Sequence, residues 1–246
     1  MRGVRASRRA ATAAGVIAAL AVWPAAASAM PASGPHETVD MGTTTAQPDA
    51  SAGLTYAARY HAANDPSGEP PALRHLLIRL PPGTRIDTSV PGRCSASDLE
   101  IMIMGESACP PSARVGTGQV TVDQIGTGVA TYDTVLYNAD HDVMELVESG
   151  GRVVGIAHTY QHGTTLDGPV PTCVTGGDPP SGCPFDELRL LANHLQISAL
   201  SVAGRNYGTT PPTCPSSGYW TLRVTLTYGD GSVDTVAPRA PCNQPA

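Results

Sequence analysis

The chain contains no lysine and very few large aromatic residues. All 15 of its basic residues are arginines, and its 246 residues include one phenylalanine and two tryptophans. Ser-x-x-Lys catalysis is therefore excluded, and no Gly-x-Ser-x-Gly elbow or glycine-rich phosphate loop is found either. A hydrophobic core has to be built from Val, Leu, Ile and Met. We assign no catalytic residue and no nucleotide or other organic cofactor from the sequence.

Hydrophobic runs long enough to cross a membrane are also absent. The longest apolar stretch, residues 10–22, falls short of the roughly 20 residues that a span needs. It follows four arginines and precedes Ala27-Ser28-Ala29, which is the pattern of a signal peptide over residues 1–29 that is cleaved near Ala29. An N-terminal membrane anchor is the less favoured alternative. We expect a secreted, extracellular chain that begins at Met30 and has no membrane span, and we leave the choice between Sec and twin-arginine export open.

Positive charge is scarce once this leader is removed. Eleven arginines then face 21 acidic residues, which gives a net charge of −10. Nucleic acids and anionic membranes are bound through dense arginine and lysine patches. Both are therefore excluded as expected partners, and an extracellular or cell-envelope ligand is favoured. The sequence does not indicate the oligomeric state.

The six cysteines all follow the leader and include no C-x-x-C pair, so a disulfide framework is favoured over a metal site. Local pairing predicts the bridges Cys94–Cys109, Cys173–Cys183 and Cys214–Cys242. Each would contribute on the order of 2–4 kcal/mol in the loop-entropy model. Other pairings satisfy the same count, so the connectivity remains a prediction.

Residues 30–53 are rich in Thr, Ala, Ser, Gly and Pro, and this composition predicts a disordered leader. Residues 54–246 are expected to form a single β-rich domain. Alternating patterns predict strands over 54–62, 72–80, 119–124, 131–137, 143–147 and 152–160. Residues 164–184 are expected to be irregular and tied down by the Cys173–Cys183 bridge.

The clearest strand covers residues 220–228, where Trp220 and Tyr228 share one face with three aliphatic residues. A tight Asp230-Gly231 turn then leads into a strand over 232–236. Residues 186–200 fit either a helix or a strand, and a strand from about Leu190 is favoured. Ser95 is expected to cap a helical turn over 95–98, which residues 99–104 either extend or follow as a buried strand. The fold class is all-β, an antiparallel sandwich or open barrel of about 8–10 short strands with long Pro/Gly-rich loops and disulfide staples.

Three stretches together resemble a known group of sequences. They are residues 80–84 with 94–99, residues 108–118 with the segment Ala-Cys-Pro-Pro-Ser-Ala-Arg-Val-Gly-Thr-Gly, and residues 209–242 with Tyr-Gly-Asp-Gly at 228–231. This set is similar to uncharacterised secreted proteins of high-GC Gram-positive bacteria. The resemblance implies export, disulfides and a β-rich fold, and it implies no activity and no functional residues.

Two clusters have side chains that could bind a metal ion. His158 and His162 have the H-x-x-x-H spacing, but Thr159 stands where zinc peptidases carry their general base. Asp140 and Asp142 lie in an oxygen-rich segment, 138–142, that could bind a hard cation such as Ca²⁺. Surface histidines at a strand end and a turn with local side-chain hydrogen bonds are the simpler interpretations.

Three functional hypotheses remain. The leading one is an exported, non-catalytic β-domain that binds an unknown partner at or outside the cell surface. The second is an extracellular metal-dependent hydrolase that uses His158 and His162, with an acid such as Asp140 or Asp142 as a further candidate ligand. The third is a carrier of a small apolar ligand, which requires an internal cavity.

Overall fold

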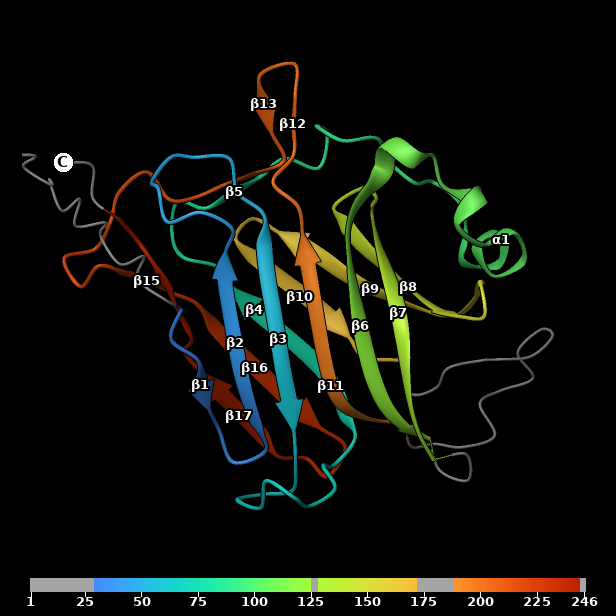
Figure 1. Ribbon diagram of the computed structural model, residues 1–246. Helices are drawn as coiled ribbons and strands as arrows, with labels where there is room; N and C mark the ends of the chain where they lie inside the picture. Colours follow the sequence, from blue (N-terminus) through green and yellow to red (C-terminus); the bar gives the residue numbers. More distant parts are fainter. Residues whose placement is uncertain (1–28, 125–127, 172–187, 244–246) are drawn as a thin grey trace, which may run out of the picture.

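The computed structural model describes residues 29–124, 128–171 and 188–243, and in these residues almost all regular structure is β (Figure 1). Twelve strands form one sheet in which every neighbouring pair is antiparallel. In spatial order they are β1 (Ala32–Ser33), β2 (Glu37–Thr43), β3 (Leu54–Tyr60), β11 (Leu188–Ile197), β6 (Arg114–Gln124), β7 (Gly128–Asn138), β8 (Asp142–Ser149), β9 (Arg152–His162), β10 (Thr165–Pro169), β4 (Leu73–Arg79), β16 (Arg223–Tyr228) and β17 (Val233–Val236).

This sheet curls into a nearly closed barrel, so that its first and last strands come close together (Figure 1). Met30 donates its backbone N–H to the carbonyl of Arg239 at 2.9 Å, and Arg239 donates back to Met30 at 3.0 Å. Arg239 begins β18, directly after β17. The all-β antiparallel prediction is confirmed, and of its two architectures the barrel-like one is present.

Short elements surround the barrel. The remaining strands are β5 (Arg85–Ile86), β12 (Ser201–Val202), β13 (Arg205–Asn206), β14 (Gly208–Thr209), β15 (Tyr219–Thr221) and β18 (Arg239–Pro241). They pair as β5–β14, β12–β13 and β15–β18. One α-helix, α1 (Asp98–Met104), and two 3₁₀ turns, η1 (Gly105–Ala108) and η2 (Pro111–Ala113), lie between β5 and β6 in the sequence. No helix in the described ranges is long and apolar enough to cross a membrane.

The barrel interior is filled by alternate residues of the strands, as a period of two requires. Val224 and Leu226 are fully buried, and Leu226 lies opposite Leu76 of β4. Trp220 is buried as expected for a core residue, and its indole N–H donates to the Thr213 carbonyl at 3.0 Å. The alternation predicted over 220–228 is confirmed, with one interruption at Leu222 between β15 and β16.

The prediction of a disordered leader over residues 30–53 is wrong. This segment supplies β1 and β2, and Val39 and Met41 of β2 are fully buried in the core. Every second residue at positions 37, 39 and 41 is buried, and this alternation makes the segment a strand despite its polar composition. Residues 165–169 likewise form β10 within a stretch predicted to be irregular. These elements explain why the sheet has more strands than predicted.

The structure decides the two segments whose sequence fitted either a helix or a strand: residues 99–104 belong to α1, and residues 188–197 form β11. Ser97, rather than Ser95, caps α1, since its hydroxyl accepts from the Glu100 N–H and the Glu100 carboxylate accepts from the Ser97 N–H. Ile101 of α1 is fully buried in a cluster with Val135 and Leu146 on the outer side of the barrel. The strand favoured from about Leu190 is confirmed as β11.

Two predicted disulfides are present, Cys94–Cys109 and Cys214–Cys242. The first closes the loop that carries α1 and η1, and the second joins the segment before β15 to the end of β18. The predicted Cys173–Cys183 bridge lies outside the described residues.

Strand β6 approaches the backbone of β11 closely at Gly118, and the absence of a side chain permits this approach. A Cβ at Gly118 would lie 2.3 Å from the His194 carbonyl oxygen and 3.0 Å from the Leu195 Cα. Because both atoms belong to the backbone, they cannot move aside as a flexible side chain would. The close contact between β6 and β11 at this position therefore depends on the missing side chain.

We predict that Gly118→Ala lowers the free energy of unfolding by about 1–3 kcal/mol, the range for overpacking a tight contact. Gly42→Ala is the matched control, because a Cβ at this strand position meets its nearest atom at an ordinary 3.5 Å. Urea unfolding followed by circular dichroism measures both. Equal stability of the two variants would show that this close contact tolerates a side chain.

Candidate functional site

The structure brings together two of the four residues proposed as metal ligands. Nδ1 of His158 lies 2.6 Å from Oδ2 of Asp142, and its Nε2 lies 3.2 Å from Oδ1 of Asp98 on α1. The hydrogen bond with Asp142 raises the pKa of His158, and the negative charges of Asp142 and Asp98 raise it further. Burial of the imidazole opposes this shift. The cluster is an imidazole between two carboxylates that connects β8, β9 and α1.

His162 and Asp140 do not join this cluster. On the extended strand β9, four residues separate His158 from His162 by about 13 Å, too far to share one ion. Asp140 is exposed and pairs with Arg93 at 2.9 Å. Asn138 is buried and donates its amide to the carbonyls of Thr88 and Gly92. The 138–142 segment is thus a hairpin turn whose side chains point to separate partners.

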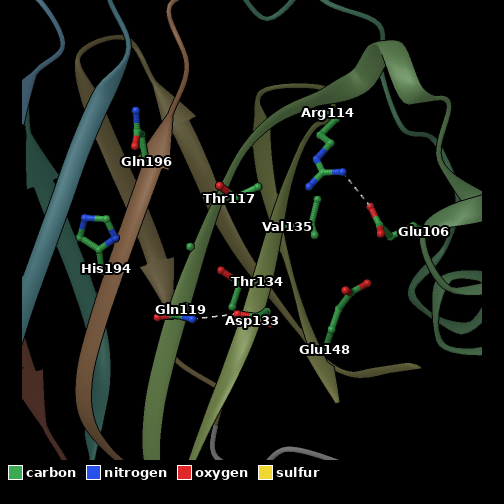
Figure 2. A pocket seen from close by; sticks show the side chains of 11 residues that line it. Glu106, Arg114, Thr117, Gln119, Asp133, Thr134, Val135, Glu148, His194 and Gln196 are labelled. Atoms are coloured by element: carbon green, nitrogen blue, oxygen red, sulfur yellow. Dashed lines mark hydrogen bonds and ion pairs between the residues drawn. The ribbon is translucent and has the colours of Figure 1, made fainter. Parts of the chain in front are cut away.

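A larger hollow of about 450 Å³ lies on the outer face of β6, β7 and β11 (Figure 2). We call it the outer groove. Its lining side chains are Glu106, Arg114, Thr117, Gln119, Asp133, Thr134, Val135, Glu148, His194 and Gln196. Cross-strand pairing explains the set, because Gln119 lies opposite both Asp133 and His194, and Thr117 lies opposite Gln196.

Carboxylates outnumber cations in the outer groove. Glu106 accepts a hydrogen bond from the Tyr137 hydroxyl at 2.7 Å and lies 3.7 Å from the Arg114 guanidinium. Asp133 accepts from the Gln119 amide at 2.9 Å. Glu148 has no hydrogen-bond or ion-pair partner within the described residues. Burial, followed by repulsion from Glu106, raises its pKa, and the charge of Arg114 opposes this only in part. A carboxylate that faces the hollow is thus left without a cation of its own (Figure 2).

One wall of the outer groove is positioned by a disulfide. Glu106 belongs to η1, and Cys109 follows this turn directly. The Cys109 N–H donates to the Glu106 carbonyl at 3.1 Å, and Cys109 is buried and bonded to Cys94. The bridge therefore holds the backbone that presents Glu106 to Arg114 and Tyr137.

A second cavity, beneath β5 and β14, is lined mainly by apolar side chains such as Leu54, Ile86 and Leu166, together with Tyr207. Its volume is only about 60 Å³. An apolar cavity that binds benzene measures about 150 Å³, and pockets for larger ligands measure roughly 300–1,000 Å³. This cavity is therefore too small to favour the carrier hypothesis.

No local sequence pattern pointed to the outer groove. Its side chains come from η1, β6, β7, β8 and β11, five elements that are dispersed along the sequence. Only the pairing of β11 with β6 brings His194 and Gln196 beside Thr117 and Gln119. A single-sequence pattern does not contain that pairing.

Comparison with known proteins adds no relative: no protein-family model, no curated protein sequence and no solved structure matches this chain.

The raised pKa of His158 predicts a pH-dependent contribution to stability. A pKa raised on folding means that the protonated pair with Asp142 stabilises the fold below the unfolded value near 6.5, and that this stabilisation is lost as the pH rises through the folded value. We expect His158→Gln to cost about 1 kcal/mol at pH 5, a figure reduced for partial solvent screening, and clearly less at pH 8.

Urea unfolding at both pH values measures this difference, and His162→Gln serves as the control because His162 is exposed on the same strand. A cost for His158→Gln that is equal at both pH values would contradict the assignment.

Proposed function

We propose that this protein is an exported, non-catalytic binding domain and that the outer groove contacts its ligand. The signal-peptide pattern of residues 1–29 supports export. The Cys94–Cys109 and Cys214–Cys242 bridges suit an oxidising compartment. The expected net charge of −10 continues to argue against nucleic acid and anionic membranes.

The groove chemistry supports binding more than catalysis. Its volume of about 450 Å³ is in the range of ligand pockets. Its amides, hydroxyls and carboxylates are arranged as cross-strand pairs rather than around one reacting atom. In the described residues, the hydroxyls of Thr117 and Thr134 make no hydrogen bond to His194 that would activate them.

The single observation that carries the proposal is the unpaired carboxylate of Glu148. Together with Glu106 and Asp133 it gives the groove three acids against one guanidinium, and that guanidinium already faces Glu106. A cationic group that enters the groove would counteract the burial and the repulsion from Glu106 that raise the pKa of Glu148. We therefore propose a ligand with a positively charged group, such as an arginine- or lysine-bearing segment of an extracellular protein.

We predict that a short arginine-rich peptide binds the protein at low salt and that Glu148→Gln weakens this binding about fivefold, the order expected for one partly exposed charge pair. The control is Asp40→Asn, which removes the same charge from an exposed position on β2, a strand that does not line the groove and is separated from β11 by β3. Isothermal titration calorimetry gives the affinities, and a glutamate-rich peptide is the negative probe.

Equal weakening by both substitutions would mean that the peptide responds only to net charge. Tighter binding of the glutamate-rich peptide would contradict the ligand class.

A further inference from the structure

A second cluster of ionisable side chains lies where the sheet closes. We call the seam the region where β1 and β2 meet β16, β17 and β18. Nδ1 of His36, just before β2, lies 2.6 Å from Oδ2 of Asp234 on β17. The neighbouring Glu37 accepts a hydrogen bond on Oε2 from the hydroxyl of Tyr228, on β16, at 2.6 Å. Four side chains from both ends of the sheet therefore meet inside the barrel.

The seam cluster is buried and has one negative charge too many. Glu37 is 0% exposed, and His36 and Asp234 are each 8% exposed. Two carboxylates face one imidazole, so even a protonated His36 leaves one acid unbalanced. Oε1 of Glu37 has no hydrogen-bond partner. Burial, supported by Asp234, raises the pKa of Glu37 against the opposing effects of Tyr228 and His36. A buried carboxylate in this position needs either a proton or a cation.

The backbone keeps space beside the unpaired oxygen. A Cβ at residue 34 would lie 2.1 Å from Oε1 of Glu37, so Gly34 leaves room that any other residue would fill. The hydroxyls of Tyr56 and Tyr60, 3.1 Å apart, and the amide of Asn193 are the other polar groups on the interior face nearby. They are neutral and supply no counter-charge.

The ligand atoms have the spacing and chemistry of a metal site. One ligand atom from each of His36, Glu37 and Asp234 lies within 4.8 Å of the others. Imidazole nitrogen and carboxylate oxygens bind Zn²⁺ at about 2.0–2.2 Å, which places ligand atoms about 3.3 Å apart around a tetrahedral ion. Nδ1 of His36 and Oδ2 of Asp234, which are 2.6 Å apart, would have to move apart by less than about 1 Å to admit the ion. The Tyr228 hydroxyl would then orient the Glu37 carboxylate from behind.

We propose that His36, Glu37 and Asp234 bind one divalent transition-metal ion of the zinc type at the seam. The ion supplies the positive charge that the three side chains lack and joins β2 to β17 across the closure. Three protein ligands leave a fourth coordination position open, as in zinc sites that keep a water molecule. The site is separate from the outer groove, so the two proposals fail independently.

The test uses the untagged protein, expressed with its leader and purified without chelators. After removal of metal and dialysis against zinc chloride, elemental mass spectrometry is expected to find about one zinc per chain. Saturating zinc is expected to raise Tm by about 5 °C, since a ligand that binds only the folded state stabilises it. Asp234→Asn keeps the shape of the side chain and is expected to weaken zinc binding at least tenfold. His158→Gln is the matched control and should bind zinc as the wild type does.

X-ray absorption at the zinc edge of the wild-type protein tests the site even if Asp234→Asn fails to fold. A shell of nitrogen and oxygen ligands near 2.0 Å with one imidazole is expected. The proposal is overturned by wild-type protein that binds no stoichiometric zinc, by sulfur ligands in the absorption spectrum, or by a folded Asp234→Asn variant that retains full affinity.

Discussion

Closure of the twelve-stranded sheet is the constraint on which the rest of the molecule depends. An open sheet of this size would expose two unpaired edges and the polar interior residues between them. The Met30–Arg239 backbone pair joins the edges, and the His36–Asp234 and Glu37–Tyr228 contacts join the side chains behind them. The same contacts bury charge, so the seam both closes the barrel and holds buried carboxylates without a full counter-charge.

The two faces of the sheet carry different chemistry. The interior is mostly aliphatic, with polar groups at the seam, at Tyr56, Tyr60 and Asn193, and at the partly buried Glu145, whose pKa desolvation raises to about 7. The outer face of β7, β8 and β9 is covered by α1, and the adjoining face of β6, β7 and β11 is left open as the outer groove. The Cys94–Cys109 bridge couples these two regions, because it closes the loop that contains both α1 and Glu106. Helix α1 covers β7, β8 and β9, and Glu106 forms one wall of the outer groove.

Sequence patterns predicted the fold wherever alternation was strong and local. The strand over 220–228 and the ambiguous segment that became β11 follow from inward-facing aliphatic residues. The prediction for residues 30–53 was wrong because the small polar residues of this segment obscured the short alternating pattern of β2, in which only Val39 and Met41 are clearly apolar.

The candidate sites could not be predicted in the same way. The H-x-x-x-H spacing singled out His158 and His162 as a pair, but a strand carries His162 away from His158, and the side chain that His158 contacts, Asp142, comes from the adjacent strand β8. His36 and Asp234 are 198 residues apart in the sequence. Their contact exists only because the barrel closes, and no local pattern encodes that closure.

The most direct test of the seam is hydrogen exchange, followed by mass spectrometry, in the Tyr228→Phe variant. This change removes one buried hydrogen bond to Glu37 and leaves the ring in place, and Tyr132→Phe, at a partly buried interior position, is the control. A hydrogen bond to a charged group is worth about 1.5–3 kcal/mol, so amides of β2 and β17 are expected to exchange at least about tenfold faster. Amides of β7 and β8 should not change. Unchanged exchange at β2 and β17, or equal acceleration throughout the sheet, would contradict the account of the seam as the contact that closes the barrel.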